Sequence, residues 1–217
     1  MKRLSAMCLA LLLAFGTAGL AHAAGSGFKN EAAPTADSVT PLMPKAGVPP
    51  FRVYDESGDY VKMNRVVLNK TTVIVFYRGH WCPYCVKHLR ELEKITSDLK
   101  ALGVQLVAIS PDKPARIAET RKDAGLTFPV YSDSTLEFAR AMGVAYKLDS
   151  ESIRQYGETL KESTGEETGQ LPVPSVFIVR DGRITFTHWD SDYTKRLPNE
   201  TLMAEVKKVV DDTAAPK

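Results

Sequence analysis

Residues 71–85 read Thr-Thr-Val-Ile-Val-Phe-Tyr-Arg-Gly-His-Trp-Cys-Pro-Tyr-Cys, and this stretch decides the fold class. Its first seven residues form an unbroken β-branched and aromatic run, which is typical of a strand buried on both faces. Cys82 and Cys85 follow, separated by two residues, where a helix is expected to begin. Pro83 suits the first position of that helix, because the N–H that proline lacks would have no helical partner there. The segment therefore predicts a buried strand that leads directly into a helix.

The sequence after Cys85 extends this pattern into a crossover between parallel strands. Apolar residues recur every three or four positions, which predicts one amphipathic helix that Gly103 ends. These residues are Val86, Leu89, Leu92, Ile95, Leu99 and Leu102. Residues 104–109 form a second apolar run, so a strand, a helix and a strand follow one another. This order indicates an α/β fold with neighbouring parallel strands.

The rest of the chain supplies further elements of one α/β domain. The Asp-Gly pair at 181–182 predicts a hairpin between strands at 176–179 and 184–188. A strand, a turn and a strand are expected within residues 51–63, as an N-terminal extension of the sheet. Helices are expected at about 114–124, 135–142, 150–161 and 199–210, with a polar loop at 163–170. Together these elements predict a single domain over residues 45–212.

The first 23 residues have the three-part pattern of a secretory signal peptide. Lys2 and Arg3 precede an apolar run at 9–20, which closes on Ala21-His22-Ala23. The run is short for a transmembrane anchor, which needs about 20 apolar residues. We therefore expect cleavage after Ala23, export to the periplasm and no stable membrane anchor afterwards. Residues 24–44 are rich in small residues and proline, and are expected to form a flexible lead-in.

The charge balance changes when this signal is removed. The 217 residues include 28 basic and 26 acidic side chains, a formal net charge of +2. Lys2 and Arg3 account for the whole excess, so the chain after Ala23 is formally neutral. A neutral balance argues against nucleic-acid binding, which usually needs a clear basic excess. Cys8 also lies in the signal, so the cysteines at 82 and 85 remain as one pair.

Cys82 and Cys85 lie where thiol chemistry is favoured. The N-terminus of a helix stabilises a thiolate, so the pKa of Cys82 is expected to fall and Cys82 to be an exposed nucleophile. Cys85 lies one turn further in, where it can attack a mixed disulfide or a sulfenic acid on Cys82. A non-enzymatic zinc-binding module is an alternative, with both cysteines, His80 and His88 as ligands, although His88 is expected on the solvated side of the helix. A disulfide between Cys82 and Cys85 with a purely structural role is a second alternative.

With these residues in view, the chain resembles the thioredoxin superfamily, and within it the peroxiredoxin-like proteins of the alkyl hydroperoxide reductase and thiol-specific antioxidant type. The likeness covers most of residues 45–210 and is strongest at 76–85. Shorter similar stretches are Gly47-Val48-Pro49-Pro50-Phe51, Ile109-Ser110-Pro111-Asp112, Phe128-Pro129-Val130 and Asp190-x-Asp192-Tyr193. The resemblance implies a thioredoxin-like fold, with a central mixed sheet flanked by helices.

The resemblance also implies a role for each site residue. Cys82 would be the peroxidatic cysteine, which attacks a hydroperoxide, and Cys85 the resolving cysteine, which closes an internal disulfide. An external dithiol, such as a thioredoxin-like protein, would reduce that disulfide, and neither a cofactor nor a metal is implied. Pro174 matches the proline that faces the cysteine pair in thioredoxin folds and is usually cis.

The sequence departs from the peroxiredoxin pattern at two positions. Gly79 stands where these proteins have Thr or Ser three residues before the reactive cysteine, and Pro174 stands where they have Arg before a later strand. Arg78 is the candidate to supply the missing positive charge, and Trp81 and Tyr84 are candidates to wall the site. The departures keep a second activity open, that of a thioredoxin- or glutaredoxin-like protein disulfide oxidoreductase, whose Cys-Pro-Tyr-Cys sequence the chain shares.

Overall fold

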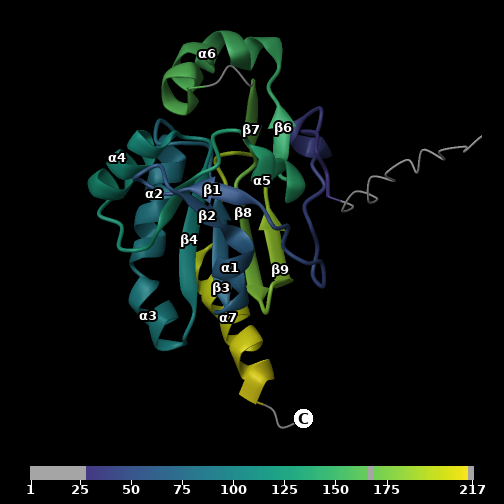
Figure 1. Ribbon diagram of the computed structural model, residues 1–217, viewed down its shortest axis with the longest axis vertical. Helices are drawn as coiled ribbons and strands as arrows, with labels where there is room; N and C mark the ends of the chain where they lie inside the picture. Colours follow the sequence, from purple (N-terminus) through teal and green to yellow (C-terminus); the bar gives the residue numbers. More distant parts are fainter. Residues whose placement is uncertain (1–27, 166–168, 215–217) are drawn as a thin grey trace, which may run out of the picture.

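The computed structural model describes residues 28–165 and 169–214, and a seven-stranded sheet lies at its centre (Figure 1). The strand order is β2-β1-β5-β4-β3-β8-β9. β3 pairs parallel to β4 and antiparallel to β8, so the sheet is mixed, as predicted. Its strands are β1 (Arg52–Tyr54), β2 (Tyr60–Lys62), β3 (Thr72–Phe76), β4 (Gln105–Ser110), β5 (Val130–Ser132), β8 (Ser175–Arg180) and β9 (Arg183–Trp189).

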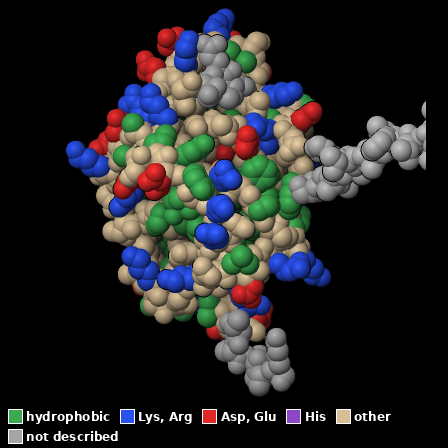
Figure 2. Space-filling view, viewed as in Figure 1, with side chains coloured by type: hydrophobic (Ala, Val, Ile, Leu, Met, Phe, Trp, Pro, Cys, Tyr) green, Lys and Arg blue, Asp and Glu red, His purple; other side chains and the backbone are tan. Residues whose placement is uncertain are grey.

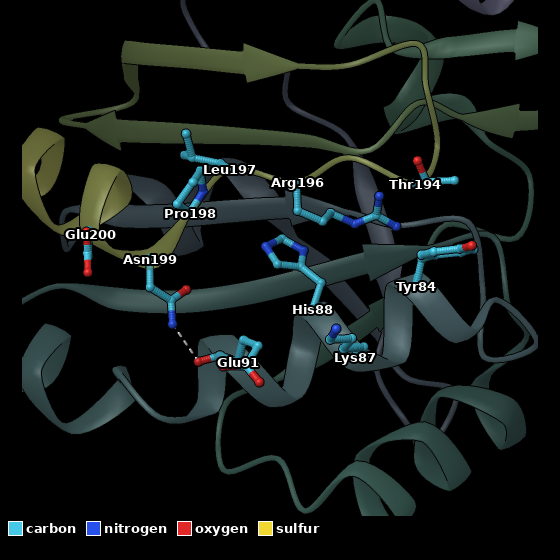
Figure 3. A pocket seen from close by; sticks show the side chains of 10 residues that line it. All are labelled: Tyr84, Lys87, His88, Glu91, Thr194, Arg196, Leu197, Pro198, Asn199 and Glu200. Atoms are coloured by element: carbon cyan, nitrogen blue, oxygen red, sulfur yellow. Dashed lines mark hydrogen bonds between the residues drawn. The ribbon is translucent and has the colours of Figure 1, made fainter.

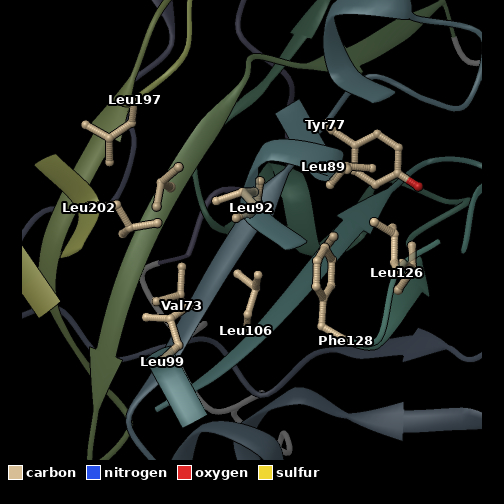
Figure 4. Packing of buried hydrophobic residues seen from close by; sticks show 14 of the residues in the cluster. Val73, Tyr77, Leu89, Leu92, Leu99, Leu106, Leu126, Phe128, Leu197 and Leu202 are labelled. Atoms are coloured by element: carbon tan, nitrogen blue, oxygen red, sulfur yellow. The ribbon is translucent and has the colours of Figure 1, made fainter. Parts of the chain in front are cut away.

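Helices cover both faces of this sheet. Successive side chains of a strand point to opposite faces, so β3 contributes to two hydrophobic clusters. Val73 and Val75 pack with residues of α2, α4 and α7, whereas Ile74 and Phe76 pack with residues of α1 and α5. Figure 4 shows the first cluster, where leucines of α2 and α7 meet the strands. The helices are η1 (Ala36–Ser38), α1 (Met63–Leu68), α2 (Pro83–Glu93), α3 (Thr96–Ala101), α4 (Pro114–Ala124), α5 (Glu137–Ala141), α6 (Ser150–Thr164) and α7 (Asn199–Ala214).

α6 lies at one end of the molecule, above the sheet in the view of Figure 1. It connects β6 (Ala145–Lys147) and β7 (Gln170–Pro172), which pair antiparallel as a separate two-stranded sheet. The helix begins after Asp149, whose carboxylate accepts a hydrogen bond from the backbone N–H of Ser152. It ends at Gly165, whose φ of 79° lies in the left-handed region. α6 therefore runs three residues past its predicted end at 161.

The helix expected from near Cys82 to Leu102 is two helices, α2 and α3. The chain leaves the helical conformation at Ile95, with φ −105° and ψ 3°, and Thr96 begins α3. The hydroxyl of Thr96 donates to the carbonyl of Leu92 across the break. The apolar spacing continues through this point, so the sequence pattern could not reveal it. The end at Gly103 is confirmed, with φ 73°.

The N-terminal segment from 28 to 44 packs on the domain, so the expected flexible lead-in is wrong for these residues. Ala32 and Val39 are buried in the cluster that contains α1 and α5. The N–H of Ala33 donates to the carbonyl of Ala145 at 2.8 Å, in a parallel bridge beside β6.

The distribution of charged side chains on the surface is consistent with a nearly neutral charge balance. Basic and acidic side chains are interspersed on the face shown in Figure 2. Within the described residues, no helix combines the length and apolarity that a membrane span requires. The predicted signal peptide, residues 1–23, lies outside the described residues and stays a prediction.

Candidate active site

The loop at 77–81 carries the chain from β3 to the cysteine pair. Cys82 is the last extended residue before α2, with φ −91° and ψ 107°, and Pro83 is the first helical residue. The Cys82 carbonyl accepts a hydrogen bond from the N–H of Cys85 at 3.0 Å. The predicted helix start is therefore confirmed, with one thiol at the helix N-terminus and the other one turn inside.

Both thiols are buried and free. The exposed fraction is 1% for Cys82 and 0% for Cys85, and both pack in the cluster formed by β3, α2 and α7. The expectation that Cys82 is exposed is therefore wrong. A helix N-terminus can be recognised from sequence, but the side chains that pack around it cannot. A substrate has to reach Cys82 in a covered site.

The surroundings make the two thiols differ in acidity. A hydrogen bond from the Cys85 side chain lowers the pKa of Cys82 to about 6, against the opposing effect of burial. The backbone N–H of Cys85 and the positive charges of Arg78 and Arg196 also contribute to this lowered pKa. Burial raises the pKa of Cys85 well above its usual value, and the neighbouring Cys82 adds to this. At neutral pH Cys82 is therefore the thiolate, and Cys85 is the thiol that donates to it.

Arg196 contacts the second thiol, a contact that no sequence motif indicated. Its Nη2 donates to the Sγ of Cys85 at 3.1 Å. Its Nη1 donates to the carbonyls of Tyr193 and Lys195, both at 2.6 Å. Arg196 lies 111 residues from Cys85, in the connection between β9 and α7, so no local spacing links them. The fold thereby places a fixed positive charge beside a buried sulfur.

Arg78, the predicted source of positive charge, is enclosed by aromatic rings. Its Cζ lies 4.2 Å from the ring centroid of Tyr193, 4.9 Å from that of Trp81 and 5.6 Å from that of Tyr156. The rings of Trp81 and Tyr156 are 5.4 Å apart, so α6 packs against the site loop. Tyr84 is instead 46% exposed and meets Tyr193 edge-on. Trp81 therefore contacts Arg78 directly, whereas Tyr84 is connected to it only through Tyr193.

Gly79 occupies a position that has no room for a side chain. Its φ of 147° is one that other residues rarely adopt. A Cβ at this position would lie 2.5 Å from Nε1 of Trp81 and 2.9 Å from Oδ1 of Asp112. The Thr or Ser of the peroxiredoxin pattern is therefore excluded here by the packing of the loop itself.

A buried carboxylate holds this loop in place. Oδ2 of Asp112 accepts hydrogen bonds from the backbone N–H of His80 at 2.8 Å and from the hydroxyl of Ser110 at 3.1 Å. The hydroxyl of Ser163 donates to Oδ1 of Asp112, and lies 3.1 Å from Nδ1 of His80. The site loop, the end of β4 and the end of α6 are thus joined at one side chain.

Pro174 lies directly before β8, at the end of the sheet where β3 enters the site loop. Its neighbour Ser175 pairs with Phe76, the last residue of β3. The described residues contain no cis peptide bond, so the expectation that Pro174 is cis is wrong. The Pro174 carbonyl accepts a hydrogen bond from the N–H of Asp190 at 3.2 Å, which ties this trans segment to the end of β9. A direct role of Pro174 beside the cysteines stays a prediction.

A groove of about 610 Å³ opens beside the pair, between α2 and residues 194–200 (Figure 3). His88 points from α2 toward that segment and is buried, so its expected solvated position is wrong. The segment covers this side of α2 and is fastened to it by Asn199, which donates to the Glu91 carbonyl at 2.7 Å. Burial lowers the pKa of His88 to about 3, and the positive Arg196 contributes, so His88 is neutral at pH 7.

The zinc alternative finds no support in this arrangement. The ring of His80 is directed to Asp112 and Ser163, while His88 lies on the groove. In the part of the chain that the structure describes, no three His, Cys, Asp or Glu side chains are grouped so that they could hold a metal ion.

Comparison with known proteins decides the family. Residues 44–187 match the model of the AhpC/TSA family. The chain belongs to the AhpC/TSA family. A Mycobacterium tuberculosis protein named "Putative peroxiredoxin MT2597" is 31% identical over 152 residues, which cover 70% of this chain and 87% of that relative. "Thiol-disulfide oxidoreductase ResA" of Halalkalibacterium halodurans is 27% identical over 122 residues, which cover 56% of this chain and 68% of that relative.

Solved structures show the same fold. Peroxidoxin BcpB of Mycobacterium tuberculosis matches with a TM-score of 0.59 at 17% identity, over 77% of this chain and 98% of that chain. Reduced Prx3 of Vibrio vulnificus, solved in complex with hydrogen peroxide, matches with a TM-score of 0.65 at 15% identity, over 76% of this chain and 96% of that chain. The predicted thioredoxin-like fold of the peroxiredoxin type is confirmed.

This AhpC/TSA protein is an oxidoreductase with a thiol-dependent role, since its relatives include peroxiredoxins and thiol–disulfide oxidoreductases. Cys82, Cys85 and Arg78 lie inside the family match, whereas Arg196 lies beyond its end at residue 187. The family pattern therefore does not account for the guanidinium beside Cys85.

Proposed function

We propose that the protein is a thiol peroxidase, with Cys82 as the peroxidatic and Cys85 as the resolving cysteine. The difference in acidity between the two thiols supports this assignment. A thiolate is the nucleophile in such chemistry, and the pKa of about 6 makes Cys82 a thiolate at neutral pH. Cys85 follows one helical turn later and stays protonated until it attacks the oxidised Cys82.

The proposed reaction has three steps. The Cys82 thiolate attacks an oxygen of the hydroperoxide, the O–O bond breaks, and the departing alkoxide or hydroxide takes up a proton, which leaves a sulfenic acid on Cys82. Cys85 then loses its proton and its sulfur attacks that of Cys82. The S–S bond forms, the S–O bond breaks, and the leaving hydroxide takes up a proton to become water. An external dithiol, such as that of a thioredoxin-like protein, reduces the disulfide by exchange.

The burial of Cys82 is the observation that carries the proposal. With 1% of its surface exposed, Cys82 favours a small substrate such as a hydroperoxide. A disulfide in a folded protein could reach the same sulfur only if the surrounding side chains moved apart, as they also have to do in the oxidised protein when the external dithiol reduces it. The positive charges of Arg78 and Arg196, both of which act on Cys82, also suit a reaction in which negative charge develops on a departing oxygen.

Exchange with protein disulfides is the second candidate. It is favoured by Gly79, because the site lacks the hydroxyl that peroxiredoxins have at that position and has no space for one. The similarity to the thiol-disulfide oxidoreductase ResA points the same way.

Stopped-flow mixing of the reduced protein with hydrogen peroxide tests the proposal. We expect rapid loss of both thiols, an inert Cys82→Ser variant, and a Cys85→Ser variant that stops at a sulfenic acid on Cys82. Oxidation no faster than that of free cysteine, combined with ready reduction of a protein disulfide, would establish the second candidate instead. Stoichiometric zinc in the purified protein would contradict both.

We also propose that the protein acts in the periplasm after removal of residues 1–23. The basic start, the apolar run and the Ala21-His22-Ala23 ending support this location. Mass spectrometry of a periplasmic extract should find a chain that begins at Ala24. A full-length chain confined to the cytoplasm would contradict the proposal.

A further inference from the structure

We propose that Arg196 is a catalytic residue of the resolving step, in which its guanidinium stabilises the Cys85 thiolate that attacks Cys82. The inference rests on the proposed function of the cysteine pair. It starts from the 3.1 Å contact between Nη2 of Arg196 and Sγ of Cys85. Arg196 thus touches a reacting atom, from outside the part of the chain that the family pattern covers.

The guanidinium of Arg196 is held in place by the chain around it. Nη1 is occupied by the carbonyls of Tyr193 and Lys195, which leaves Nη2 directed at the sulfur. The segment that carries Arg196 is fastened to α2 by the hydrogen bond from Asn199 to the carbonyl of Glu91. Because Cys85 lies on the same helix, this hydrogen bond fixes the guanidinium relative to its target. Such preorganisation is what electrostatic catalysis requires.

The resolving step needs a positive charge at this sulfur. Cys85 is completely buried, and an uncompensated charge at such a position is costly. Before the reaction Cys85 is a thiol that donates to the Cys82 thiolate. Once Cys82 is a sulfenic acid, that acceptor charge is gone and Cys85 has to become the nucleophile. Its proton then balances the hydroxide that leaves Cys82 as water.

The other positive side chain of the site does not serve Cys85 in the same way. The guanidinium of Arg78 is stacked among the rings of Tyr193, Trp81 and Tyr156. Arg78 supports the Cys85 thiolate through its backbone N–H, which a side-chain substitution leaves in place. The charge at Cys85 therefore comes from Arg196, and substitution of Arg196 should affect the second step more than the first.

The first experiment separates the two steps with hydrogen peroxide. Reduced wild-type protein, Arg196→Met and Arg196→Lys are mixed with peroxide, and sulfenic acid and disulfide are followed by quenching and mass spectrometry. We expect Arg196→Met to form the sulfenic acid within a few-fold of the wild-type rate but to close the disulfide about tenfold to a hundredfold more slowly. Arg196→Lys, which keeps the charge, should recover much of the second rate. Excess peroxide should convert more Cys82 to sulfinic acid in Arg196→Met.

Arg180→Met is the matched control. Arg180 is also partly buried and donates through Nη1 to a backbone carbonyl, that of Val209 at 2.6 Å, but it has no described contact with the cysteines. Its substitution should leave both rates unchanged. An unchanged second rate in Arg196→Met, an equal loss in Arg180→Met, or an Arg196→Lys variant as slow as Arg196→Met would each overturn the inference.

The second experiment needs no peroxide and so separates this inference from the proposed function. The reduced proteins are mixed with dithiobis(nitrobenzoic acid), which releases one coloured thiol when Cys82 attacks it and a second when Cys85 attacks the mixed disulfide. A slower second release in Arg196→Met supports the inference even if wild-type protein forms no sulfenic acid with peroxide, a result that would count against the peroxidase function alone. Equal second releases in wild type and Arg196→Met would overturn the inference.

Discussion

The buried carboxylate of Asp112 accepts a 2.8 Å hydrogen bond from the backbone N–H of His80, two residues before the reactive thiol. The two residues lie 32 positions apart in the chain, yet this bond fixes the loop that presents Cys82 to α2. Ser163 of α6 donates to the same carboxylate. The shape of the site loop therefore depends on a residue at the end of another strand.

Replacement of Asp112 by Ala should destabilise the protein by about 2–4 kcal/mol, because it leaves several donors without an acceptor in a buried place. Urea unfolding measures this cost. Ser163→Ala is the matched control, since it removes one donor and keeps the carboxylate, and it should cost about 1 kcal/mol. Equal costs for the two variants would show that the loop does not depend on Asp112.

Replacement of Gly79 by Thr should not improve peroxide reduction, although it restores the residue type of the peroxiredoxin pattern. The new Cβ would collide with Trp81 and Asp112 at an unfavourable φ, and we expect a cost of about 2–5 kcal/mol. Gly125→Thr is the control for backbone strain alone, because its φ is 66° and a Cβ there meets nothing within 4 Å. A Gly79→Thr protein that is as stable as Gly125→Thr and faster with peroxide would contradict this account.

The rate of Cys82 oxidation should depend on pH through the pKa of about 6. Because the thiolate is the reactive form, the rate should fall as the pH drops through 6 and level off above 7. Cys85→Ala removes the hydrogen bond that is the largest cause of the shift, and the profile should move to higher pH. Iodoacetamide alkylation of Cys82 across a pH series gives the same pKa without peroxide. A profile centred at the pKa of an ordinary thiol would contradict the assignment of Cys82 as the thiolate.

Replacement of Arg78 by Met should raise the pKa of Cys82, because a positive charge near the thiolate is lost. Arg78→Lys keeps the charge and should raise it less, although it loses the planar stacking on three rings. Arg154→Met serves as the control, because Arg154 is an exposed arginine of α6 paired with Glu151. The measurement is again the pH dependence of Cys82 alkylation, and identical profiles for Arg78→Met and Arg154→Met would refute the role of Arg78.

Asp133 should make the protein less stable as the pH rises from about 4 to 7. This carboxyl accepts the backbone N–H groups of Phe138 and Ala139 at the start of α5, and burial raises its pKa to about 7. The folded state then binds a proton that the unfolded state has released, so stability is highest below the unfolded pKa and is lost toward pH 7. A shift of about three units corresponds to roughly 4 kcal/mol as an upper limit. Denaturation at several pH values should show this slope in wild type and a smaller one in Asp133→Asn; equal slopes would contradict it.

The local features of the fold could be predicted from the sequence. β3 follows from the run of β-branched and aromatic residues at 71–77, and α4 has the predicted bounds Pro114–Ala124 because proline and glycine delimit it. The break at Ile95 and the packing of residues 28–44 could not be predicted. The packing of residues 28–44 depends on tertiary contacts, and the break at Ile95 leaves the apolar spacing unchanged.

The candidate site could be predicted in part for the same reason. The helix start at Cys82 follows from residues that are adjacent in the chain, and so does the lowered pKa. The cage around Arg78 and the contact of Arg196 with Cys85 depend on α6 and on residues 193–196, which reach the site only in the folded chain. Arg196 lies in a loop before the C-terminal helix, and no pattern in a single sequence distinguishes it from the other arginines.

The packing of residues 28–44 on the domain limits where the protein can be truncated or fused to another protein. The family match begins at residue 44, and an expression boundary placed there would remove the bridge from Ala33 to Tyr146 and the buried side chains of Ala32 and Val39. Such a truncated protein would expose an apolar strip beside β6, the strand that leads into α6, and should aggregate more readily. The N-terminal boundary of a shortened protein should therefore lie no later than Phe28, and an N-terminal tag on the exported protein should follow Ala23.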